Sequence, residues 1–249
     1  MVPAILSVAN QKGGVGKTTT ATCLAHGLAL TGRRVLVVDV DHQANATSGM
    51  GIDAAPRSSA FASDTLDTGV VDTPWPGVHA VPAGRDLERL SVRGLPSLLV
   101  LKDHLEGLPA SRFDAILIDC PPSLGPLTQS ALAASTGVVV PIQCEYYPLE
   151  GLVQLLAAVR QATDGNPRLA VAGVLLTMYD PALDLSREVE AEVRGKLTEP
   201  VFATVSPRDV AVAEAPSHCR SVIEYAPRSP GARGYVELAL EVVARGLVK

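Results

Sequence analysis

Five stretches of this chain are unbroken apolar runs about as long as a β-strand, and helix-forming segments separate them. The runs cover residues 4–9, 34–39, 113–119, 136–142 and 169–177. A strand carries apolar side chains at successive positions when helices cover both faces of its sheet. Each run therefore predicts a buried strand of a parallel sheet.

Helices are expected between these strands. The candidate segments are residues 17–30 and about 86–106, 125–134, 149–163, 184–196 and 232–246. Strands that alternate with helices predict right-handed βαβ crossovers, and hence an α/β fold with a doubly wound, mostly parallel sheet and helices on both faces. Ligands of such folds bind at the carboxyl ends of the strands. Residues 53–76 lack a clear period, which predicts an irregular surface connection.

The composition predicts one domain with a large core. The 249 residues are 47% hydrophobic and 19% charged, so we expect a single domain over residues 1–249. No apolar run approaches the length that spans a membrane. The cysteines form no C-x-x-C pair, which disfavours a zinc site or disulfide framework and predicts buried, reduced thiols. They are Cys23, Cys120, Cys144 and Cys219.

The segment NQKGGVGKTT, at residues 10–19, has the chemistry of a phosphate-binding loop. Its glycines let backbone N–H groups converge on phosphate oxygens, and the helix beginning at Lys17 adds its dipole. Lys17 would pair with the β and γ phosphates, the Thr18 hydroxyl would bind Mg²⁺, and Thr19 would reach the α phosphate. The other loop residues expected at the nucleotide are Gly13, Gly14, Val15 and Gly16.

Two features separate this loop from the usual pattern. G-x-x-x-x-G-K-[ST] requires glycine where Gln11 stands, and an additional lysine, Lys12, precedes the paired glycines. A glycine-rich turn followed by a chance Lys-Thr is the alternative interpretation. The predicted strand before the loop and the predicted helix after it favour a phosphate site.

Acidic side chains end two other predicted strands. Asp39 and Asp41 follow an apolar run, and Asp119 ends the run at residues 113–119. Residues two apart in a strand point the same way, so Asp39 and Asp41 could hold the water ligands of a metal and orient an attacking water. Asp119 has the position of a Walker B carboxylate. Capping of the next loop is the alternative role for Asp39 and Asp41.

Together these motifs resemble the ParA/Soj partition ATPases, in the deviant Walker A (MinD-like, SIMIBI) class of P-loop proteins. The residues that carry the resemblance are KGGVGKTTT, VLVVDVDHQANAT, ILIDCPPSLGPLTQSAL, PIQCEYYPLEGL, LLTMYD, VSPRDVAVAEAPSH and APRSPGARGY. The match runs nearly from end to end and is weakest over residues 53–110. It implies the P-loop NTPase fold.

The resemblance also implies roles for individual residues. Lys12 would be the signature lysine that reaches the nucleotide of a partner subunit, and Asp41 would orient or activate the hydrolytic water. Asp39 and Asp119 would lie near the Mg²⁺. The wall on the adenine side of the nucleotide would be formed by Thr177, Met178, Pro207 and Arg208.

The function implied by the resemblance is that of an ATP-dependent switch for chromosome or plasmid partition. The protein would be a Mg²⁺-dependent ATP hydrolase, slow without its partner, and would form an ATP-sandwich homodimer. That dimer would bind double-stranded DNA without sequence specificity, and a ParB-type protein would stimulate hydrolysis and release. The protein would be cytoplasmic and associated with the nucleoid, with no membrane attachment.

The DNA-binding part of this expectation depends on basic residues. The formal net charge of -5 gives no general attraction to DNA, so contact would need a local patch. Ala211 stands where the family usually has an arginine implicated in DNA contact. The remaining candidates are interspersed with acidic residues, so a mixed solvated surface is the alternative. They are Arg194, Lys196, Arg220, Arg228 and Arg233.

Other functions on the same fold remain open at this point. A MinD-like positioning ATPase would need a basic amphipathic C-terminal helix, whereas residues 235–249 carry Glu237 and Glu241. In that segment Leu238, Val242 and Val243 form a stripe suited to packing on the domain. A metabolic P-loop ligase would depend on a small substrate rather than on DNA and a partner protein.

Overall fold

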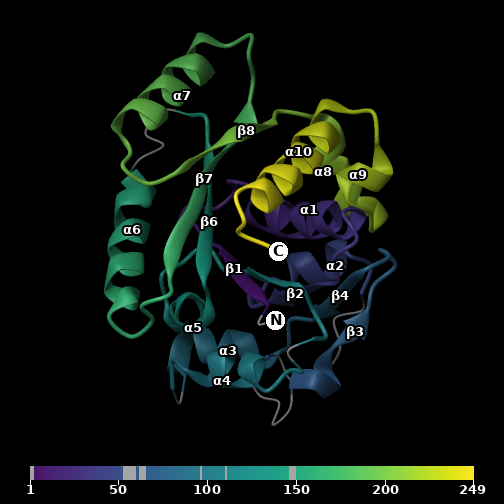
Figure 1. The fold of residues 1–249 in the computed structure, drawn as a ribbon, viewed down its shortest axis with the longest axis vertical. Helices are drawn as coiled ribbons and strands as arrows, with labels where there is room; N and C mark the ends of the chain where they lie inside the picture. The colour runs from purple at the N-terminus through teal and green to yellow at the C-terminus, as the bar shows by residue number, and fades with distance from the viewer. Residues whose placement is uncertain (1–2, 53–59, 62–65, 96, 110, 146–149) are drawn as a thin grey trace.

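An eight-stranded sheet forms the centre of the protein, in the order β3-β4-β2-β5-β1-β6-β7-β8 (Figure 1). Neighbouring strands are parallel except β3 and β4, which are antiparallel. The computed structural model describes residues 3–52, 60–61, 66–95, 97–109, 111–145 and 150–249. The expected doubly wound, mostly parallel α/β fold is confirmed.

Each of the apolar runs forms a strand, and further strands appear that the pattern missed. The strands are β1 (Ala4–Val8), β2 (Val35–Asp39), β3 (Val71–Asp72), β4 (Val78–Val81), β5 (Ala115–Asp119), β6 (Gly137–Gln143), β7 (Ala170–Tyr179) and β8 (Val201–Pro207). The strands β3, β4 and β8 were not predicted. The first two are only two and four residues long, and β8 is an edge strand whose side chains are buried at only some positions.

The helices largely follow the expected segments. They are α1 (Lys17–Leu30), α2 (Asn45–Gly49), α3 (Asp86–Arg93), α4 (Val100–Glu106), α5 (Pro126–Ala134), α6 (Glu150–Thr163), α7 (Asp184–Lys196), α8 (Val210–Glu214), α9 (Val222–Tyr225) and α10 (Pro230–Ala244), with 3₁₀ turns η1 (Leu66–Gly69) and η2 (Ala215–His218). The prediction of one helix over 86–106 is wrong. Gly94 ends α3 with a φ of 82°, and a separate helix, α4, follows.

Helices cover both faces of the sheet (Figure 1). Alternate residues of β2 show this, because Leu36 and Val38 belong to one apolar core, and Val35 and Val37 belong to the other. The first core is closed by α3 to α7, and the second by α1, α2, α9 and α10. Two-sided burial is the physical reason that the strand segments are apolar without interruption.

The C-terminal helix is part of the second core. In α10, Leu238 and Val242 are fully buried, and the helix packs on α1 and β8. The approach to α1 is close, because a Cβ added at Gly27 would lie 2.8 Å from the Cβ of Ala239. The expected packing of this stripe on the domain is confirmed. No helix within the described ranges is long and apolar enough to cross a membrane.

Two smaller expectations need correction. The connection at residues 53–76 is not wholly irregular, because its described part contains η1, β3 and the fully buried Trp75. Residues 53–59 and 62–65 of that connection lie outside the described residues. The four cysteines are free, as expected, but Cys219 is exposed, since it lies at the end of the surface turn η2.

Candidate functional site

The loop between β1 and α1 is shaped by two glycines in the left-handed region. Gly14 has a φ of 76° and Gly16 a φ of 84°, a conformation that strains other residues. Between them, the carbonyl of Val15 accepts a hydrogen bond of 2.9 Å from the Thr177 hydroxyl of β7. The loop is thus fastened to the sheet directly before α1 begins at Lys17.

The two lysines of the loop have different surroundings. Lys17 is buried, and its Nζ donates a hydrogen bond of 2.9 Å to the carbonyl of Lys12. Burial lowers the pKa of Lys17, although Asp119 and Asp41 oppose this effect. The Lys12 ammonium instead lies 3.2 Å from Glu145 Oε2, and both side chains are partly exposed. Lys17 is thus placed within the site, while Lys12 pairs with a carboxylate of its own chain.

Asp119 is a buried carboxylate that has no hydrogen-bond partner in the part of the chain that the structure describes. It ends β5, it is fully buried, and neither carboxylate oxygen forms a hydrogen bond within the described residues. Burial and then the neighbouring Asp39, its register partner on β2, raise its pKa well above the usual range. The Thr18 hydroxyl lies near enough to oppose this shift. Such an unpaired group is costly unless a cation or proton neutralises it.

Asp39 and Asp41 differ in their contacts despite their spacing. Asp39 is fully buried, and burial raises its pKa to about 6, while hydrogen bonds from Thr47 oppose the shift. Asp41 follows the end of β2, and its Oδ1 accepts a hydrogen bond of 3.0 Å from the Gln43 N–H. The His42 ring lies 3.5 Å from the same oxygen.

Part of this set lines one pocket of about 620 Å³, which we call the glycine-loop pocket, whereas the expected residues Lys12, Val15, Asp39 and Asp119 do not line it. Its size suits a small-molecule ligand. The expected residues that line it are Gly13, Gly14, Gly16, Lys17, Thr18, Thr19, Asp41, Thr177, Met178, Pro207 and Arg208. The structure therefore brings the loop, the Asp41 segment and the two segments expected at the adenine into a single cavity.

Residues at the ends of β7 and β8 form another part of the pocket lining. Met178, near the end of β7, has a φ of 51°, an unusual backbone conformation for methionine. The Arg208 N–H donates a hydrogen bond of 2.8 Å to the carbonyl of Tyr179, which joins the segments after β7 and β8. The Thr177 hydroxyl is directed to backbone carbonyls of Val15 and Ile142. Its side chain thus holds the loop in place.

Several residues of this site carried no signal in the sequence. Glu145 is 133 positions from Lys12, and Thr47 contacts Asp39 from a short helix. Asn45, Asp209 and Tyr235 also line the glycine-loop pocket. An acidic residue at 145 and a threonine at 47 are ordinary in isolation, so only the fold shows what they contact.

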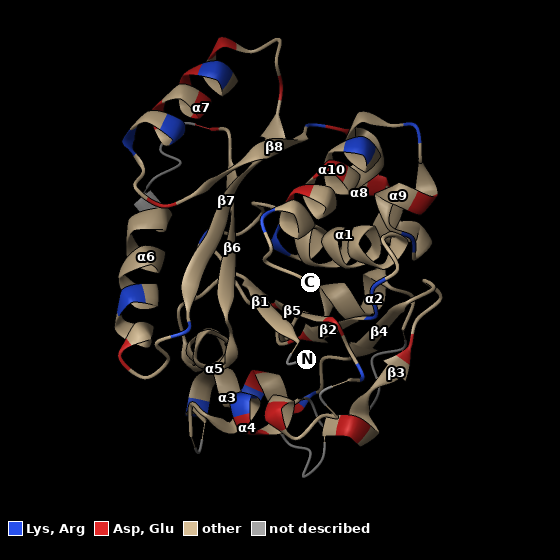
Figure 2. Cartoon of the chain, viewed as in Figure 1, with Lys and Arg blue, Asp and Glu red and all other residues tan. Residues whose placement is uncertain are grey.

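The candidate DNA-contact residues fall into two groups. Three are paired with acidic neighbours on the surface: Arg194 with Glu190 at 2.8 Å, Lys196 with Glu192 at 2.8 Å and Arg220 with Glu224 at 3.4 Å. Arg228 and Arg233 are exposed, and no ion pair joins them to another described residue. Figure 2 shows acidic and basic residues side by side along α7 and α10. Three of the five candidates therefore share their surface with a carboxylate that pairs with them.

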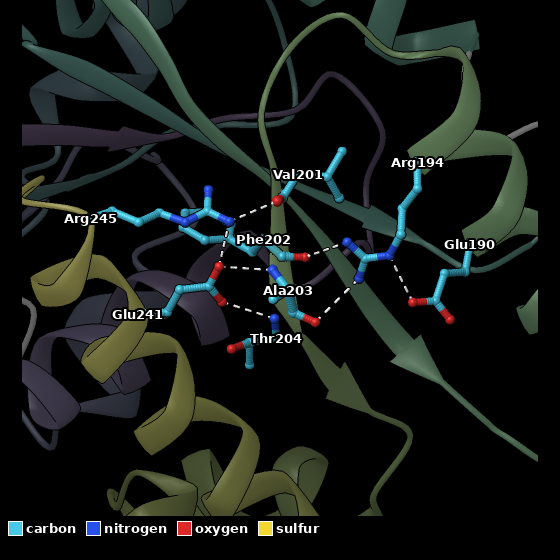
Figure 3. A network of polar contacts seen from close by, with 8 residues as sticks. All are labelled: Glu190, Arg194, Val201, Phe202, Ala203, Thr204, Glu241 and Arg245. Carbon is cyan, nitrogen blue, oxygen red and sulfur yellow. Dashed lines mark hydrogen bonds and ion pairs between the residues drawn. The ribbon is translucent and has the colours of Figure 1, made fainter.

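Arg194 has a structural role at the edge of the sheet (Figure 3). Its guanidinium donates hydrogen bonds to the carbonyls of Phe202 and Ala203 in β8. From α10, Glu241 accepts hydrogen bonds from the N–H groups of Ala203 and Thr204. Together these side chains satisfy backbone groups of the edge strand, which leaves Arg194 less free to contact DNA.

Comparison with known proteins gives consistent matches. The AAA domain family matches residues 3–171. The chromosome-partitioning ATPase Soj of Thermus thermophilus is 49% identical over 96% of this chain and 95% of its own length. The chromosome partitioning protein ParA of Caulobacter vibrioides is 41% identical over 97% of this chain and 94% of its own length.

A solved structure has a similar fold. The cobyrinic acid a,c-diamide synthase of Mycobacterium smegmatis, solved with bound ADP and magnesium, superimposes with a TM-score of 0.84 at 33% identity. The match covers 98% of this chain and 97% of that protein. The sheet and its surrounding helices therefore form an architecture that holds a magnesium nucleotide in another protein.

Proposed function

The chain belongs to the Soj/ParA family of chromosome-partitioning ATPases, and on that premise we propose that ATP makes it dimerise and so switches on DNA binding. In this proposal the glycine-loop pocket binds Mg²⁺-ATP and two copies close around two nucleotides. The dimer binds DNA without sequence specificity, and a ParB-type protein stimulates hydrolysis and release.

The observation that carries the proposal is the unpaired carboxylate of Asp119 beside Lys17 and Thr18. A buried carboxylate with no hydrogen-bond donor fits a cation, and Mg²⁺ prefers oxygen ligands. Among the described residues no three His, Cys, Asp or Glu side chains group as ligands. The ion would thus be held by Thr18, Asp119, water and phosphate oxygens, with Asp39 nearby. When bound, it would neutralise charge on the β and γ phosphates.

The loop residues would bind the phosphates. The N–H groups of Gly13 to Thr19 would donate hydrogen bonds to the phosphate oxygens, and the dipole of α1 would favour their negative charge. The Lys17 ammonium, now on the Lys12 carbonyl, would turn to the β and γ phosphates. Thr177, Met178, Pro207 and Arg208 would form the wall beside the base, since they line the same cavity.

Asp41 would orient the attacking water. It lines the glycine-loop pocket, and the Gln43 N–H fixes one of its oxygens. Its role fits the general requirement for hydrolysis of ATP, in which positioning of the nucleophile supplies much of the rate. Replacement of Asp41 should therefore slow hydrolysis more than it weakens nucleotide binding.

Lys12 would act on the nucleotide of the second copy. Gly13 and Gly14 line the pocket, whereas the Lys12 ammonium pairs with Glu145 at a partly exposed position. A lysine that reaches across the interface would make ATP part of the interface, so that hydrolysis would weaken the dimer. The slow basal rate and the partner-stimulated rate would follow from how completely the two subunits close.

Binding of DNA would use the exposed cations on α10 and the turn before it, Arg228 and Arg233. The paired candidates Arg194, Lys196 and Arg220 would contribute less, because each would first have to leave a carboxylate. A protein of this kind would be cytoplasmic and would associate with the nucleoid. Membrane attachment is not part of the proposal, since the apolar stripe of α10 is buried.

The experiment that tests this function measures ATP hydrolysis under four conditions. Purified protein is assayed with Mg²⁺-ATP alone, with unrelated duplex DNA, with the ParB-type protein of the same organism, and with both. A partition ATPase should show the highest rate with both together. An unchanged rate in all four conditions would contradict the proposal.

A metabolic function has one observation in its favour, the similarity to a solved cobyrinic acid a,c-diamide synthase. An amide-forming ligase of that class would hydrolyse ATP only when its small acid substrate is present. Adding cobyrinic acid and an amide-nitrogen donor to the same assay distinguishes the two functions. The family assignment predicts no response.

A further inference from the structure

The Asp39 carboxylate is occupied by hydrogen bonds from its own chain. Its Oδ2 accepts hydrogen bonds from the N–H of Thr47 at 2.9 Å and from the Thr47 hydroxyl at 2.7 Å. Its Oδ1 accepts one from the N–H of Asp41 at 3.1 Å. Because each carboxylate oxygen has about two lone-pair positions, Oδ2 is saturated and Oδ1 keeps about one position. Most of the hydrogen-bonding capacity of Asp39 is therefore used within its own chain.

Thr47 links three segments of the fold. It is fully buried in α2, and its hydroxyl oxygen also accepts a hydrogen bond of 2.9 Å from the N–H of Ala83. Ala83 follows β4 and lies just before α3. The Thr47 hydroxyl thus joins the end of β2, the start of α2 and the segment after β4.

The loop closed by these bonds is the one that carries Asp41. Residues 40–46 run from the end of β2 into α2, and the Asp39 carboxylate binds N–H groups at both ends of this loop, on Asp41 and on Thr47. Within the loop Ala44 has a φ of 54°, a strained conformation for alanine. Strained backbone persists only where surrounding contacts hold it, and it gathers at functional sites.

We propose that Thr47 and Asp39 are positioning residues for ATP hydrolysis, which hold the 40–46 loop so that Asp41 faces the glycine-loop pocket. The inference rests on the proposed function, in which Asp41 orients the attacking water. It gives Asp39 a task different from the metal-adjacent one implied by the family resemblance. A misplacement of about 1 Å in such a group can cost about 10²-fold in rate.

The test compares two substitutions of Thr47. Thr47→Val removes the hydroxyl and keeps the shape of the side chain, whereas Thr47→Ser keeps the hydroxyl. Thr47→Ala replaces Thr47→Val if that variant does not fold. We expect kcat for Mg²⁺-ATP hydrolysis with duplex DNA to fall about 10- to 100-fold in Thr47→Val and to recover to within about threefold in Thr47→Ser.

A threonine at the amino ends of the strands, opposite to the pocket end, provides a matched control. The Thr136 hydroxyl accepts a hydrogen bond of 3.1 Å from the Ile5 N–H and makes one of 3.0 Å to the Ile5 carbonyl. It precedes β6, at the amino ends of the strands and far from the pocket. Thr136→Val therefore loses comparable bonds, and it should lower the melting temperature without changing kcat.

Two further measurements separate positioning from stability. The dissociation constant of a fluorescent ATP analogue should change by less than about twofold in Thr47→Val, because Thr47 is outside the phosphate loop. Hydrogen exchange of the amides at 40–50 should accelerate in that variant alone.

Two results would overturn the inference by itself. One is a kcat in Thr47→Val that falls no further than in Thr136→Val, and the other is a failure of Thr47→Ser to recover. Failure of the proposed function looks different. In that case the wild-type protein would not hydrolyse ATP, or Asp41→Ala would hydrolyse it at the wild-type rate, and the positioning role would fall with it.

Discussion

The ammonium of Lys12 lies 3.2 Å from Glu145 Oε2 of the same chain, and the two side chains are 44% and 43% exposed. Gln143 donates a hydrogen bond to the other oxygen of Glu145 and so holds the carboxylate in place. In the proposed dimer Lys12 would have to leave this partner for a phosphate of the second subunit. In the proposed dimer this ion pair would therefore compete with the contact across the interface.

Removing the competing charge should favour the dimer. An exposed ion pair contributes about 0.2–1 kcal/mol, and two such pairs break for each dimer formed. Glu145→Gln should therefore lower the dimer dissociation constant, measured by sedimentation with a non-hydrolysable ATP analogue, by about 2- to 30-fold.

The control is a similar ion pair on the surface of α7. Glu192 pairs with Lys196 at 2.8 Å, with side chains 39% and 69% exposed. Glu192→Gln changes the net charge by the same amount and should leave the dimer constant unchanged. An equal shift in both variants would attribute the effect to net charge, and no shift in Glu145→Gln would show that the pair does not restrain Lys12.

The second prediction concerns the carboxylate assigned to the metal. Asp119→Asn keeps the size of the side chain and removes its charge. Wild-type protein should melt at a higher temperature with Mg²⁺-ATP than without it, since a ligand stabilises the state that binds it. In Asp119→Asn this increase should largely disappear. A full increase in the variant would show that Asp119 does not support the bound metal.

The same substitution tests the electrostatics of the nucleotide-free protein. Burial raises the pKa of Asp39 to about 6 and that of Asp119 well above its usual range. An unfolded aspartate loses its proton near pH 4, so from there upward the folded state binds more protons than the unfolded state. The free energy of unfolding contributed by this pair therefore falls as the pH rises through about 4 to 6 and beyond.

Urea unfolding at pH 5, 6 and 7 measures this effect. Without nucleotide, Asp119→Asn should be more stable than wild type at pH 7, and its advantage should shrink toward pH 5. In a parallel thermal unfolding experiment, each kcal/mol gained in the free energy of unfolding should raise the melting temperature by about 2–4 °C for a chain of this length. If the stability difference between Asp119→Asn and wild type is the same at all three pH values, packing rather than charge explains it.

The fourth prediction distinguishes the exposed cations from the paired ones. Each phosphate contact adds about one unit to the dependence of DNA affinity on salt. Arg228→Ala with Arg233→Ala should weaken ATP-dependent binding to unrelated duplexes and reduce the salt slope by about two units. Mobility shifts at several salt concentrations provide the measurement.

Two single substitutions complete that experiment. Arg194→Ala should lower stability by about 0.5–1.5 kcal/mol, the net contribution of a hydrogen bond, because water can reach the edge-strand carbonyls that it leaves, while the DNA affinity of the folded protein stays nearly constant. Arg168→Ala serves as a control for the loss of one positive charge elsewhere on the surface, because this side chain is 61% exposed and lies 4.0 Å from Glu106. Loss of DNA binding in Arg194→Ala alone would reverse the assignment.

The sequence was sufficient to predict the features that depend on local pattern. The loop before α1 is recognised by its glycines, and β2 is apolar over consecutive residues because both faces of the sheet are buried. The edge strand β8 was missed because its side chains are buried at only some positions, so it leaves no continuous apolar run in the sequence. Several of its backbone groups are satisfied by Arg194 of the preceding helix α7 and by Glu241 of α10.

The site was predicted unevenly, because spacing in the sequence does not show tertiary contacts. Residues of the loop and the strand ends could be named from their spacing, whereas the partners that give them different roles could not. Asp39 and Asp41 look equivalent in the sequence, but Asp39 is bound by Thr47 and Asp41 lines the pocket. That difference depends on the position of α2, which is set by tertiary packing.

In the proposed switch ATP joins two copies through Lys12. The decisive experiment is sedimentation velocity of the wild type and of Lys12→Ala, each with Mg²⁺ and a non-hydrolysable ATP analogue. We predict a dimer for the wild type and a monomer for Lys12→Ala, with the analogue bound to both. A Lys12→Ala variant that dimerises as completely as the wild type would contradict the account.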